Sequence, residues 1–467
     1  MIEGLKPYAE YKDSGLPWAS RIPTHWSLVP NRAVLKRRKV LVGEQHRDYK
    51  LLSLTKKGLV VRDISTGKGK FSSDLGTSQE VRKGDLVFCL FDIPETPRTV
   101  GLSAHDGMIT SAYTVFESTK LTKNGVRYLE KFYLALDDQK LMSPLYSGLR
   151  NTIAPPRFLG TKTPLPPPDE QAAIVRFLDH ANRKIDRFIR VKRKLIGLLN
   201  EQKQAIIHRA VARGLDPNVA LKPSGGLWFK EVPKLWDVVT MGRVIRAAID
   251  GPHFSPQYQN KGIPFLSARN VRADKWLLDN AKFISESNYK LFCKRVIPEV
   301  GDVLYTKGGT TGVARAVDLE FPFQVWVHIA VLKLDRQMIT PEFLALCLNS
   351  PRCYEQAQLF TRGATNQDLG LGRMKQIEMP LPPTLAEQVE IVSWVKAQLE
   401  TFTTAITRTE REIALMQEYR TRLTSDIVTG KLDVREAAAK LPELSEEAGI
   451  ELLDEAEILD DTDAEET

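Results

Sequence analysis

The residues whose types and spacing could support chemistry form no complete catalytic pattern. Lys307–Gly312 (Lys-Gly-Gly-Thr-Thr-Gly) has the glycines of a phosphate-binding loop but lacks the Lys-Ser/Thr ending that holds a triphosphate and its magnesium. Ala154–Phe158 (Ala-Pro-Pro-Arg-Phe) lacks the polar residue that would engage an amino group in methyl transfer. The 7 histidines are scattered, with no paired-ligand spacing. We therefore expect neither an active site nor a metal site.

The charge balance points instead to a polyanionic partner. The 467 residues contain 66 Lys and Arg against 58 Asp and Glu. Twelve of the acidic residues lie in residues 443–467, which have no Lys or Arg, so residues 1–442 hold 66 basic against 46 acidic residues, a net charge of +20. A basic body attracts nucleic acid, because neutralised phosphates release their counterions.

Length and composition favour several domains in a chain that lies in the cytoplasm. At 42% hydrophobic residues the chain can bury real cores, and about 150 residues per domain predicts roughly three domains. Neither a signal peptide nor a run of the roughly 18 apolar residues that a membrane span needs is expected. The 4 cysteines lack CxxC spacing, so we interpret them as reduced thiols, mostly in cores.

An internal repeat organises the chain. Ser14-Gly-Leu-Pro-Trp18, followed by Ile-Pro and Trp26, recurs as Ser224-Gly-Gly-Leu-Trp228, followed by Val-Pro and Trp236. Further motifs repeat in the same order. Gly84-Asp85 matches Gly301-Asp302, and Gly148-x-x-Asn151 matches Gly363-x-x-Asn366. Leu165-Pro-Pro matches Leu381-Pro-Pro, and each of these is followed by Glu-Gln-x-x-Ile. The chain is therefore predicted to be two copies of one unit.

Each copy combines two kinds of periodicity. The first part is rich in Gly, Pro and Thr and has short strand-like runs at 86–90, 109–116, 303–306 and 325–332. After each Pro run the apolar period becomes helical, and the seam of alternating three- and four-residue steps continues over about 44 residues, or roughly 66 Å of helix. An antiparallel coiled-coil pair is the natural geometry, because a whole globular domain lies between the two helices. The alternative is that each helix packs separately on its own domain.

The helix pair has predicted seam residues and two polar interruptions. Residues 169–213 carry eleven basic and five acidic side chains, and 386–429 carry five and seven, so the flanks attract each other. Lys192 and Thr409 are polar seam positions that either set register or are solvated breaks. The apolar seam and partner-facing residues are Ile174, Leu178, Ile185, Leu195, Leu199, Ile391, Val395, Phe402, Ile406 and Met416.

The fold class expected is α+β, with two globular domains separated by two long antiparallel coiled-coil helices and related by a pseudo-two-fold repeat. The boundaries are a first domain at 1–168, a first helix at 169–222, a second domain at 223–385, a second helix at 386–430 and an acidic, disordered tail at 431–467. A sharper hypothesis is that the tail screens the basic body from nonspecific DNA or touches a partner, and deletion of residues 443–467 would test the screening.

These motifs closely resemble the specificity subunit of type I restriction-modification systems. The resemblance rests on the repeated Leu-Pro-Pro-x-x-Glu-Gln-x-x-Ile entry to a long helix, on Lys203–Val211, on Gly301-Asp302-Val303-Leu304 and on Gly363–Gly370. It covers nearly the whole chain. It implies two target-recognition domains that each read one half of an asymmetric bipartite DNA site, and spacer helices that dock two methyltransferase subunits, with restriction-translocase subunits joining them.

The resemblance also implies that this chain is not an enzyme. S-adenosylmethionine, ATP and Mg would be held by the partner subunits, so we expect no cofactor or metal in this chain, and double-stranded DNA as its ligand. The alternative, from another functional class, is a helical adaptor or competitor whose globular domains bind protein or RNA. The sequence recognised cannot be predicted from composition.

Candidate DNA contacts are basic, Gly-rich and amide residues in both domains. Lys supplies charge for phosphate, Gly permits close backbone approach, and Arg, Asn and Gln pair bidentately with base edges. The candidates are Lys56, Lys57, Lys68, Lys70, Arg98, Thr99 and Asn151 in the first domain, and Arg269, Asn270, Lys307, Gly308, Gly309, Thr310, Thr311, Arg362, Asn366 and Gln367 in the second.

Each candidate has a structural alternative. Lys-rich turns are usually solvated surface, and Asn151 and Asn366 are equally suited to capping their own turns. The four tryptophans that flank the repeated prolines can stack on bases, but their fixed spacing favours a structural clasp.

Overall fold

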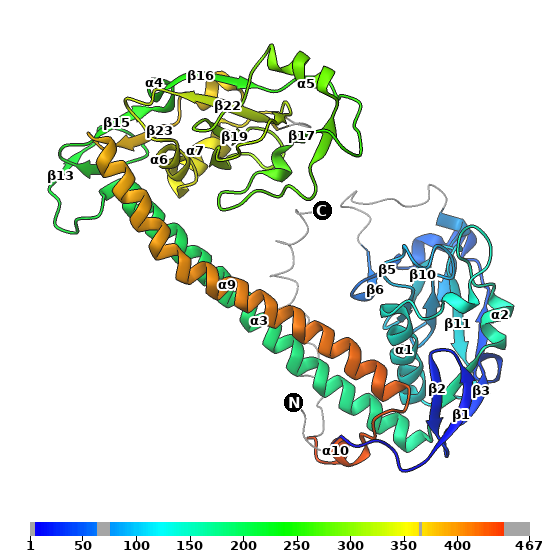
Figure 1. The fold of residues 1–467 in the computed structure, drawn as a ribbon. Coiled ribbons are helices and arrows are strands. Elements are labelled where there is room, and N and C mark those ends of the chain that lie inside the picture. The colour runs from blue at the N-terminus through cyan, green and yellow to red at the C-terminus, as the bar shows by residue number, and fades with distance from the viewer. Residues whose placement is uncertain (1–4, 63–74, 364–366, 443–467) are drawn as a thin grey trace. The chain divides into compact units, whose positions relative to one another are not determined.

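Two compact units make up the computed structural model, which describes residues 5–62, 75–363 and 367–442. Unit 1 comprises residues 1–191 and 412–467, and unit 2 comprises residues 192–411. The long helices α3 (Pro168–Arg213, 46 residues) and α9 (Leu385–Val428, 44 residues) each pass from one unit into the other (Figure 1). The predicted α+β class with two long helices is confirmed, but the helix ends belong to the units instead of forming separate domains.

Unit 1 is built around an antiparallel four-stranded sheet of order β4-β11-β8-β9. Its strands are β4 (Leu35–Arg38), β11 (Thr114–Ser118), β8 (Leu86–Phe88) and β9 (Val100–Leu102). The two-stranded pairs are β1 (Tyr11–Leu16) with β2 (Ala19–Pro23), β3 (Ser27–Pro30) with β12 (Lys162–Leu165), β5 (Leu52–Thr55) with β6 (Gly58–Val61), and β7 (Gln79–Val81) with β10 (Gly107–Ile109). The helices are α1 (Lys123–Asp138), α2 (Pro155–Gly160) and α10 (Arg435–Ala439).

Unit 2 has a four-stranded sheet of the corresponding order, β16-β22-β19-β20. Its strands are β16 (Ile245–Asp250), β22 (Ile329–Leu334), β19 (Val303–Thr306) and β20 (Ala314–Ala316). Beside it lie the pair β13 (Leu221–Pro223) and β14 (Glu231–Pro233), the pair β15 (Asp237–Thr240) and β23 (Glu378–Leu381), and a sheet of β18 (Lys282–Ile284), β17 (Ile263–Leu266) and β21 (Gln324–Val325). The helices are α4 (Met241–Val244), α5 (Glu286–Cys293), α6 (Pro341–Leu348), α7 (Pro351–Phe360) and α8 (Leu371–Met374).

The structure confirms the predicted repeat. The strand after each Gly-Asp pair, β8 or β19, occupies the third position of its sheet, and β3–β12 in unit 1 corresponds to β15–β23 in unit 2. The predicted strand at 303–306 matches β19. The runs at 109–116 and 325–332 are each divided between two strands, because residues 110–113 and 326–328 form turns within these apolar runs.

Each unit's core includes one end of both long helices. In unit 1, Ile174 and Leu178 of α3 join the same core cluster as Leu423 and Ile427 of α9. In unit 2 the opposite ends meet, with Val211 of α3 and Ile391 and Val395 of α9 in one cluster. The start of one helix therefore accompanies the end of the other in both units, which confirms the antiparallel pairing.

Two side-chain contacts agree on the register of the pair. In unit 1, Arg420 forms an ion pair with Asp186. In unit 2, Lys203 Nζ donates to Thr403 Oγ1 at 3.3 Å. Moving 17 residues forward along α3 from Asp186 to Lys203 corresponds to moving 17 residues back along α9 from Arg420 to Thr403. Figure 1 shows the two helices side by side.

The predicted seam is buried most deeply at the ends of the helices. Leu199, Phe402, Ile406 and Met416 are half-buried, and Leu195 is exposed, whereas the remaining predicted seam residues are buried: Ile174, Leu178, Ile185, Ile391 and Val395. Buried Thr409 donates its hydroxyl to Ala405 O within its own helix, and Lys192 is half-buried. A register role for Lys192 and Thr409 stays a prediction.

The helix ends and the tail differ from the predicted boundaries. The first helix ends at Arg213 instead of residue 222, because Gly214 adopts a positive φ of 70° and ends the turn. The prediction of a disordered tail from residue 431 was wrong for residues 431–442. Val434 and Ala438 are buried in the core of unit 1, and Asp433 N donates to Lys6 O at 2.8 Å. Residues 443–467 lie outside the described residues.

Two kinds of feature are absent from the described part of the chain. No helix there is long and apolar enough to cross a membrane. Within the same residues, no group of three or more His, Cys, Asp or Glu side chains could hold a metal ion.

Candidate nucleic-acid interface

The repeated Gly-Asp motif holds the central sheet of each unit together. Asp85 is buried and accepts a hydrogen bond from Arg38 Nε on the sheet's edge strand at 2.8 Å. Asp302 is equally buried and lies 2.7 Å from Lys333 Nζ on β22. Both carboxylates also accept a backbone N–H from three residues earlier, Arg82 N in unit 1 and Glu299 N in unit 2. The motif is therefore structural.

Two loops meet beside this sheet in each unit. The strand loop joins β8 to β9 (residues 89–99) or β19 to β20 (307–313). The return loop precedes α2 (147–152) or α8 (362–368, of which 364–366 lie outside the described residues). Ile153 N donates to Leu90 O at 2.8 Å in unit 1, and Leu369 N donates to Lys307 O at 2.7 Å in unit 2. The two elements that the sequence analysis singled out separately are thus adjacent in both repeats.

An ion pair also joins the two loops in each unit, with opposite polarity. In unit 1 the acid is on the strand loop: Asp92 accepts from Arg150 Nε at 3.1 Å, and Arg150 lies 5.2 Å above the ring of Phe91. The hydrogen bond from Arg150 lowers the pKa of Asp92. In unit 2 the base is on the strand loop, and Lys307 Nζ lies 2.6 Å from Asp368 Oδ1.

A third predicted element joins the loops of unit 1. Lys56 and Lys57 are exposed on the turn between β5 and β6. Arg98 Nη2, on the strand loop, donates to Lys56 O at 3.0 Å. Three of the candidate groups, the lysine turn, Arg98 and the return loop with Asn151, therefore lie on connected segments of one unit.

The structure divides the candidate residues by accessibility. Those with exposed side chains or backbone are Lys56, Lys57, Arg269, Gly309, Thr310, Arg362 and Gln367, while Arg98 and Asn151 are half-buried. Buried positions are Thr99, Asn270, Lys307, Gly308 and Thr311. Lys68, Lys70 and Asn366 lie outside the described residues. The accessible residues remain candidate DNA contacts.

The interpretation of Lys307 as a phosphate-binding lysine does not fit its surroundings. Its side chain is only 6% exposed, and its Nζ lies between Asp368 and, at 3.6 Å, the buried Asp250. Asp250 also pairs with Arg295. Two adjacent carboxylates neutralise the positive charge of this lysine, so it attracts phosphate only weakly. The sequence could not show this, because Asp250 and Asp368 are distant in the chain.

Asn270 and Thr99 are likewise part of the structure of their units. Asn270 Oδ1 accepts from Ser267 N at 2.8 Å, and its Nδ2 donates to Leu277 O at 2.8 Å, so its amide cannot also pair bidentately with a base. Thr99 is fully buried, and its backbone N donates to Asp137 Oδ2 at 2.7 Å. Neither side chain is available for a base contact.

Gly308 and Asn151 also have structural reasons for their residue types. A Cβ on Gly308 would lie 2.3 Å from His328 Nδ1, so glycine is needed for packing beside the histidine. Asn151 has a positive φ of 43°, in the turn closed by the Ser147–Thr152 bridge. Asn tolerates that conformation better than most residues, which agrees with the turn alternative.

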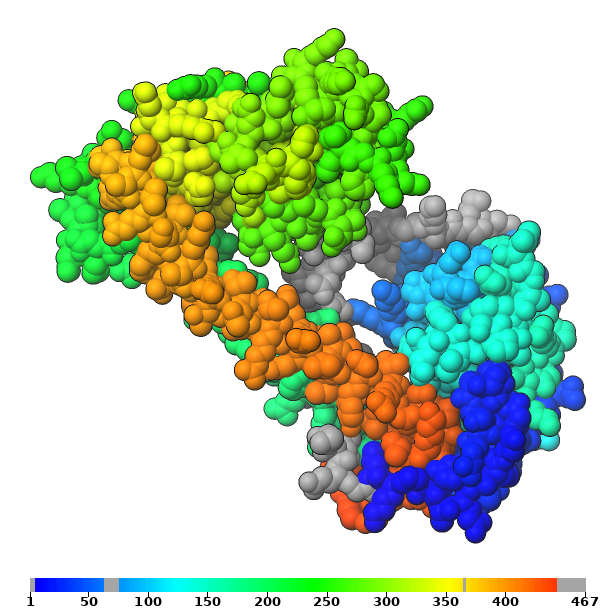
Figure 2. Space-filling model, viewed as in Figure 1, coloured from blue at the N-terminus to red at the C-terminus, as the bar shows by residue number. Residues whose placement is uncertain are grey.

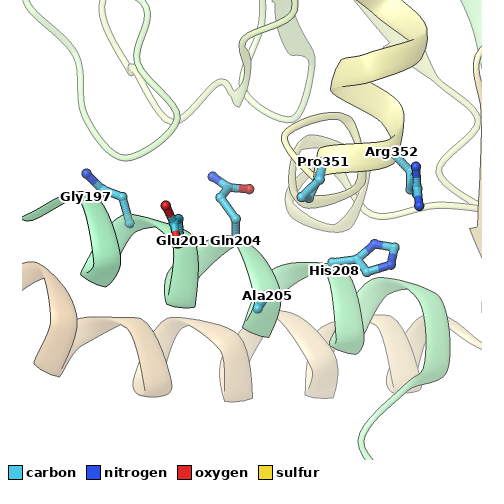
Figure 3. A pocket seen from close by; sticks show the side chains of 8 residues that line it. Gly197, Glu201, Gln204, Ala205, His208, Pro351 and Arg352 are labelled. Atoms are coloured by element: carbon cyan, nitrogen blue, oxygen red, sulfur yellow. The ribbon is translucent and has the colours of Figure 1, made fainter. Parts of the chain in front are cut away.

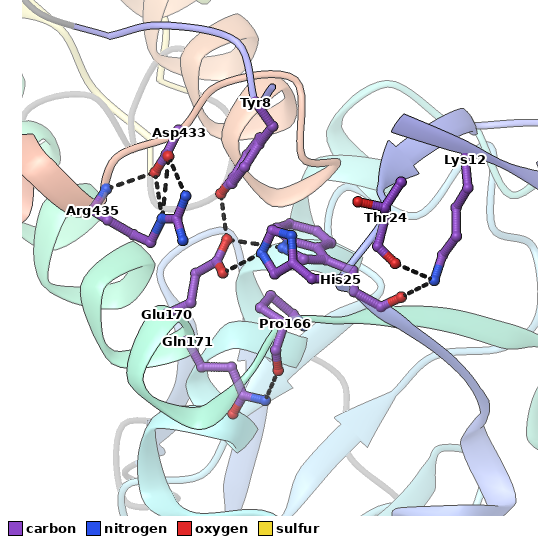
Figure 4. Close-up of polar contacts among 10 residues, drawn as sticks. Tyr8, Lys12, Thr24, His25, Pro166, Glu170, Gln171, Asp433 and Arg435 are labelled. Carbon is purple, nitrogen blue, oxygen red and sulfur yellow. Dashed lines mark hydrogen bonds and ion pairs between the residues drawn. The ribbon is translucent and has the colours of Figure 1, made fainter. Parts of the chain in front are cut away.

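The tryptophan clasp is confirmed, and its acceptor is the glutamate of the Glu-Gln motif. Trp26 Nε1 donates to Glu170 Oε1 at 2.8 Å, and Trp236 Nε1 donates to Glu387 Oε1 at 2.9 Å. Glu170 also accepts from Tyr8 Oη at 2.5 Å and lies 2.8 Å from His25 Nε2. Figure 4 shows these side chains converging on the Glu170 carboxylate. Burial raises the pKa of Tyr8, and its hydrogen bond to Glu170 raises it further. Burial and the bound acceptor make Trp26 unavailable for stacking on bases.

A groove in unit 2 lies between α3 and the start of α7 (Figure 3). Its lining combines Ala205 and Pro351 with polar residues that include Gln204, His208 and Arg352. Burial lowers the pKa of His208, and the nearby Arg352 and Arg213 lower it further.

Comparison with known proteins relates part of this chain to a protein family. Residues 233–415 match the family model of the type I restriction modification DNA specificity domain. This part of the chain is similar to a type I DNA specificity domain. The resemblance inferred from the sequence motifs is thereby confirmed, and sequence-specific recognition of DNA is the function of such a domain. The adaptor alternative finds no support.

The specificity domain spans most of unit 2 and continues into α9. Its limits include Trp236, the Gly-Asp motif at 301–302, both loops and the Glu-Gln motif. Residues 1–191 of unit 1 lie outside the match, but they repeat the same sheet order, the same loop junction and the same tryptophan clasp.

One solved structure shares the fold of the chain, and two others match it with lower TM-scores. One is a chain from a study of complex assembly and conformational transition of the type I R-M system, with 14% identity, a TM-score of 0.57, and coverage of 87% of this chain and 98% of that one. Others are the HsdS subunit from Thermoanaerobacter tengcongensis (14% identity, TM-score 0.40, coverage 88% and 98%) and the type I S subunit from M. genitalium (12%, 0.34, 90% and 97%).

Proposed function

We propose that this chain determines which DNA sequence a type I restriction-modification complex recognises, with each unit reading one half of an asymmetric bipartite site. The observation that carries the proposal is the duplicated junction of strand loop and return loop, which presents different side chains in the two units. Arg98 and the lysine turn accompany it in unit 1, and Thr310, Arg362 and Gln367 accompany it in unit 2. Similar scaffolds with different exposed side chains suit two unequal half-sites.

The chain's proposed role is recognition without catalysis. S-adenosylmethionine would be held by methyltransferase subunits, and ATP and Mg by restriction-translocase subunits, so each reaction would occur on a partner. The proposed location is the cytoplasm, where chromosomal DNA of a bacterium is accessible.

The proposed docking surface for two methyltransferase subunits is the outer face of the long helices. Apolar side chains remain exposed there, with Leu198 at 48%, Trp394 at 39% and Leu415 at 58%. Figure 2 shows α9, in orange, presenting an uncovered surface along its length. Exposed apolar side chains on a helix are typical of a protein-protein interface.

Genome-wide mapping of methylated adenines tests the proposal. Strains with and without this chain would be compared, and methylation at one bipartite asymmetric sequence should disappear on deletion. Identical methylation in both strains would contradict it. Neighbouring reading frames that encode an adenine methyltransferase and a helicase-nuclease would supply the partners for reconstitution.

A further inference from the structure

We propose that the ion pair between the strand loop and the return loop fixes the DNA-reading side chains of each unit, so that Asp92 with Arg150, and Lys307 with Asp368, are positioning residues for sequence discrimination. This inference rests on the proposed function. It concerns residues that do not themselves need to touch a base.

The pair in unit 1 is held more tightly than its exposure suggests. Arg150 is 68% exposed, yet its guanidinium meets the Asp92 carboxylate through Nε and Nη2 and covers the ring of Phe91. Asp92 N also donates to Arg150 O at 2.8 Å. Side-chain and backbone contacts therefore join the same two residues, which keeps the return loop with Asn151 at a fixed distance from the strand loop with Arg98.

Additional charged residues hold the ion pair of unit 2 in place. Lys307 is held on one side by Asp368 and on the other by Asp250, which in turn pairs with Arg295 and lies 3.3 Å from His253 Nε2. The backbone at Gly308 forms a bridge with Asp368, and so does that at Arg362. Exposed Thr310, Arg362 and Gln367 project from segments that this network connects.

The two ion pairs do not occupy equivalent positions of the repeat. Counted from the Gly-Asp motif, Lys307 stands at the position of Leu90, and Asp92 stands at the position of Gly309. The backbone hydrogen bond between the loops is shared, but the charged link is built from different positions with the opposite polarity. The two units therefore join their strand loop to their return loop by different ion pairs. This indicates that a charged link between the loops is needed in addition to the backbone hydrogen bond that both units share.

Sequence discrimination depends on such a link because base contacts tolerate little displacement. A bidentate contact needs its donor and acceptor atoms in register with one base edge, and each mismatched pair costs ~1–3 kcal/mol only when that register is kept. A loop that moves still meets phosphate, since charge attraction is less directional. Loss of the link should therefore reduce discrimination more than affinity.

The test uses the full-length chain and a pool of duplex DNA with random sequence. The wild-type chain selects its preferred duplex, and its affinity is then measured for that duplex and for single substitutions in each half. We expect Asp92→Asn to reduce discrimination about tenfold in one half-site only, the size of one lost base contact, and Asp368→Asn to do so in the other half-site only. Affinity for unrelated duplex should stay within about twofold, since phosphate contacts remain.

Matched variants separate positioning from other effects. Glu95→Gln removes the same charge from an exposed residue of the same loop and should leave discrimination unchanged. Arg150→Lys should keep most of it, and Arg150→Met should lose it. Because Asp92 and Arg150 are surface residues, the thermal midpoints of their variants should stay close to the wild-type value.

Three results would overturn the inference while leaving the proposed function intact. One is unchanged discrimination in Asp92→Asn and Asp368→Asn. Another is an equal loss in both half-sites from either variant. A third is a loss in Arg150→Met without a loss in Asp92→Asn, which would make Arg150 a direct DNA contact. A wild-type chain that selects no sequence, alone or with its methyltransferase, would instead contradict the proposed function.

Discussion

The indole nitrogen of Trp26 donates a hydrogen bond to the carboxylate of Glu170, 144 residues later in the chain. Glu170 lies in the first turn of α3, so this bond ties the start of a long helix to the small strands that open unit 1. Trp236 and Glu387 make the same connection at the start of α9 in unit 2. The repeated tryptophan and the repeated Glu-Gln motif are therefore two ends of one contact.

Removing the two glutamates should have unequal effects. Glu170 accepts from Tyr8, His25 and Trp26, while Glu387 accepts from Trp236. Glu170→Ala should lower the free energy of unfolding by about 3 kcal/mol and Glu387→Ala by about 1 kcal/mol, because each buried donor left unpaired adds its own penalty. Chemical denaturation followed by tryptophan fluorescence measures both. Equal losses would show that the additional partners of Glu170 contribute nothing.

The stability of unit 2 should depend on Asp250 at acidic pH. Burial raises the pKa of Asp250, but the hydrogen bond from Arg295 and the nearby charges of Lys307 and His253 lower it more, so the net pKa is lowered. A lowered pKa in the folded state stabilises the fold above the unfolded value of about 4, and this contribution is lost as the pH falls through the folded value. Asp250→Asn should therefore be less stable than wild type at pH 7 and should lose less on acidification. Parallel stability curves for the two proteins between pH 7 and pH 3 would contradict this.

The cysteines should differ sharply in reactivity. Burial raises the pKa of Cys353 to about 12, and burial also raises the pKa of Cys89 and Cys347, so these three thiols are both covered and protonated. Cys293 is only partly buried. Alkylation of the native chain followed by mass spectrometry should modify Cys293 first, and the other three at the rate of unfolding. Rapid modification of Cys347 would mean that unit 2 opens locally.

Lys307→Met should change stability and not the salt dependence of DNA binding. Its loss leaves buried Asp250 with one cationic partner fewer, which should cost about 2 kcal/mol, less than the full cost of breaking a buried pair because Arg295 remains. The slope of log affinity against log salt should stay that of the wild type, since Lys307 is too buried to release counterions. Lys56→Met, which removes an exposed lysine of unit 1, is the matched control and should reduce the slope. A reduced slope for Lys307→Met would restore it as a phosphate contact.

Periodicity and repetition were sufficient to predict the architecture but not the partners of individual side chains. The helical stripes from Ile174 and Ile391, and the echoes around Trp26 and Gly84, depend on local spacing, which a sequence displays directly. The environment of Lys307 depends on Asp250 and Asp368, which lie 57 and 61 residues away in the chain and are brought together only by the sheet. The environment of Asn270 could not be predicted for the same reason, because its acceptor Leu277 O lies in an irregular segment that has no sequence motif.

The pairing of Lys6 with Asp433 has a consequence for the order in which the protein can form. Unit 1 draws on residues from both ends of the chain, so its core stays open until Val434 and Ala438 have been synthesised. Unit 2 is a single uninterrupted segment, residues 192–411, and has all of its core residues available earlier. On the ribosome, the second globular part of the chain can therefore be complete before the first, and residues 5–191 must wait for the last helix to close them.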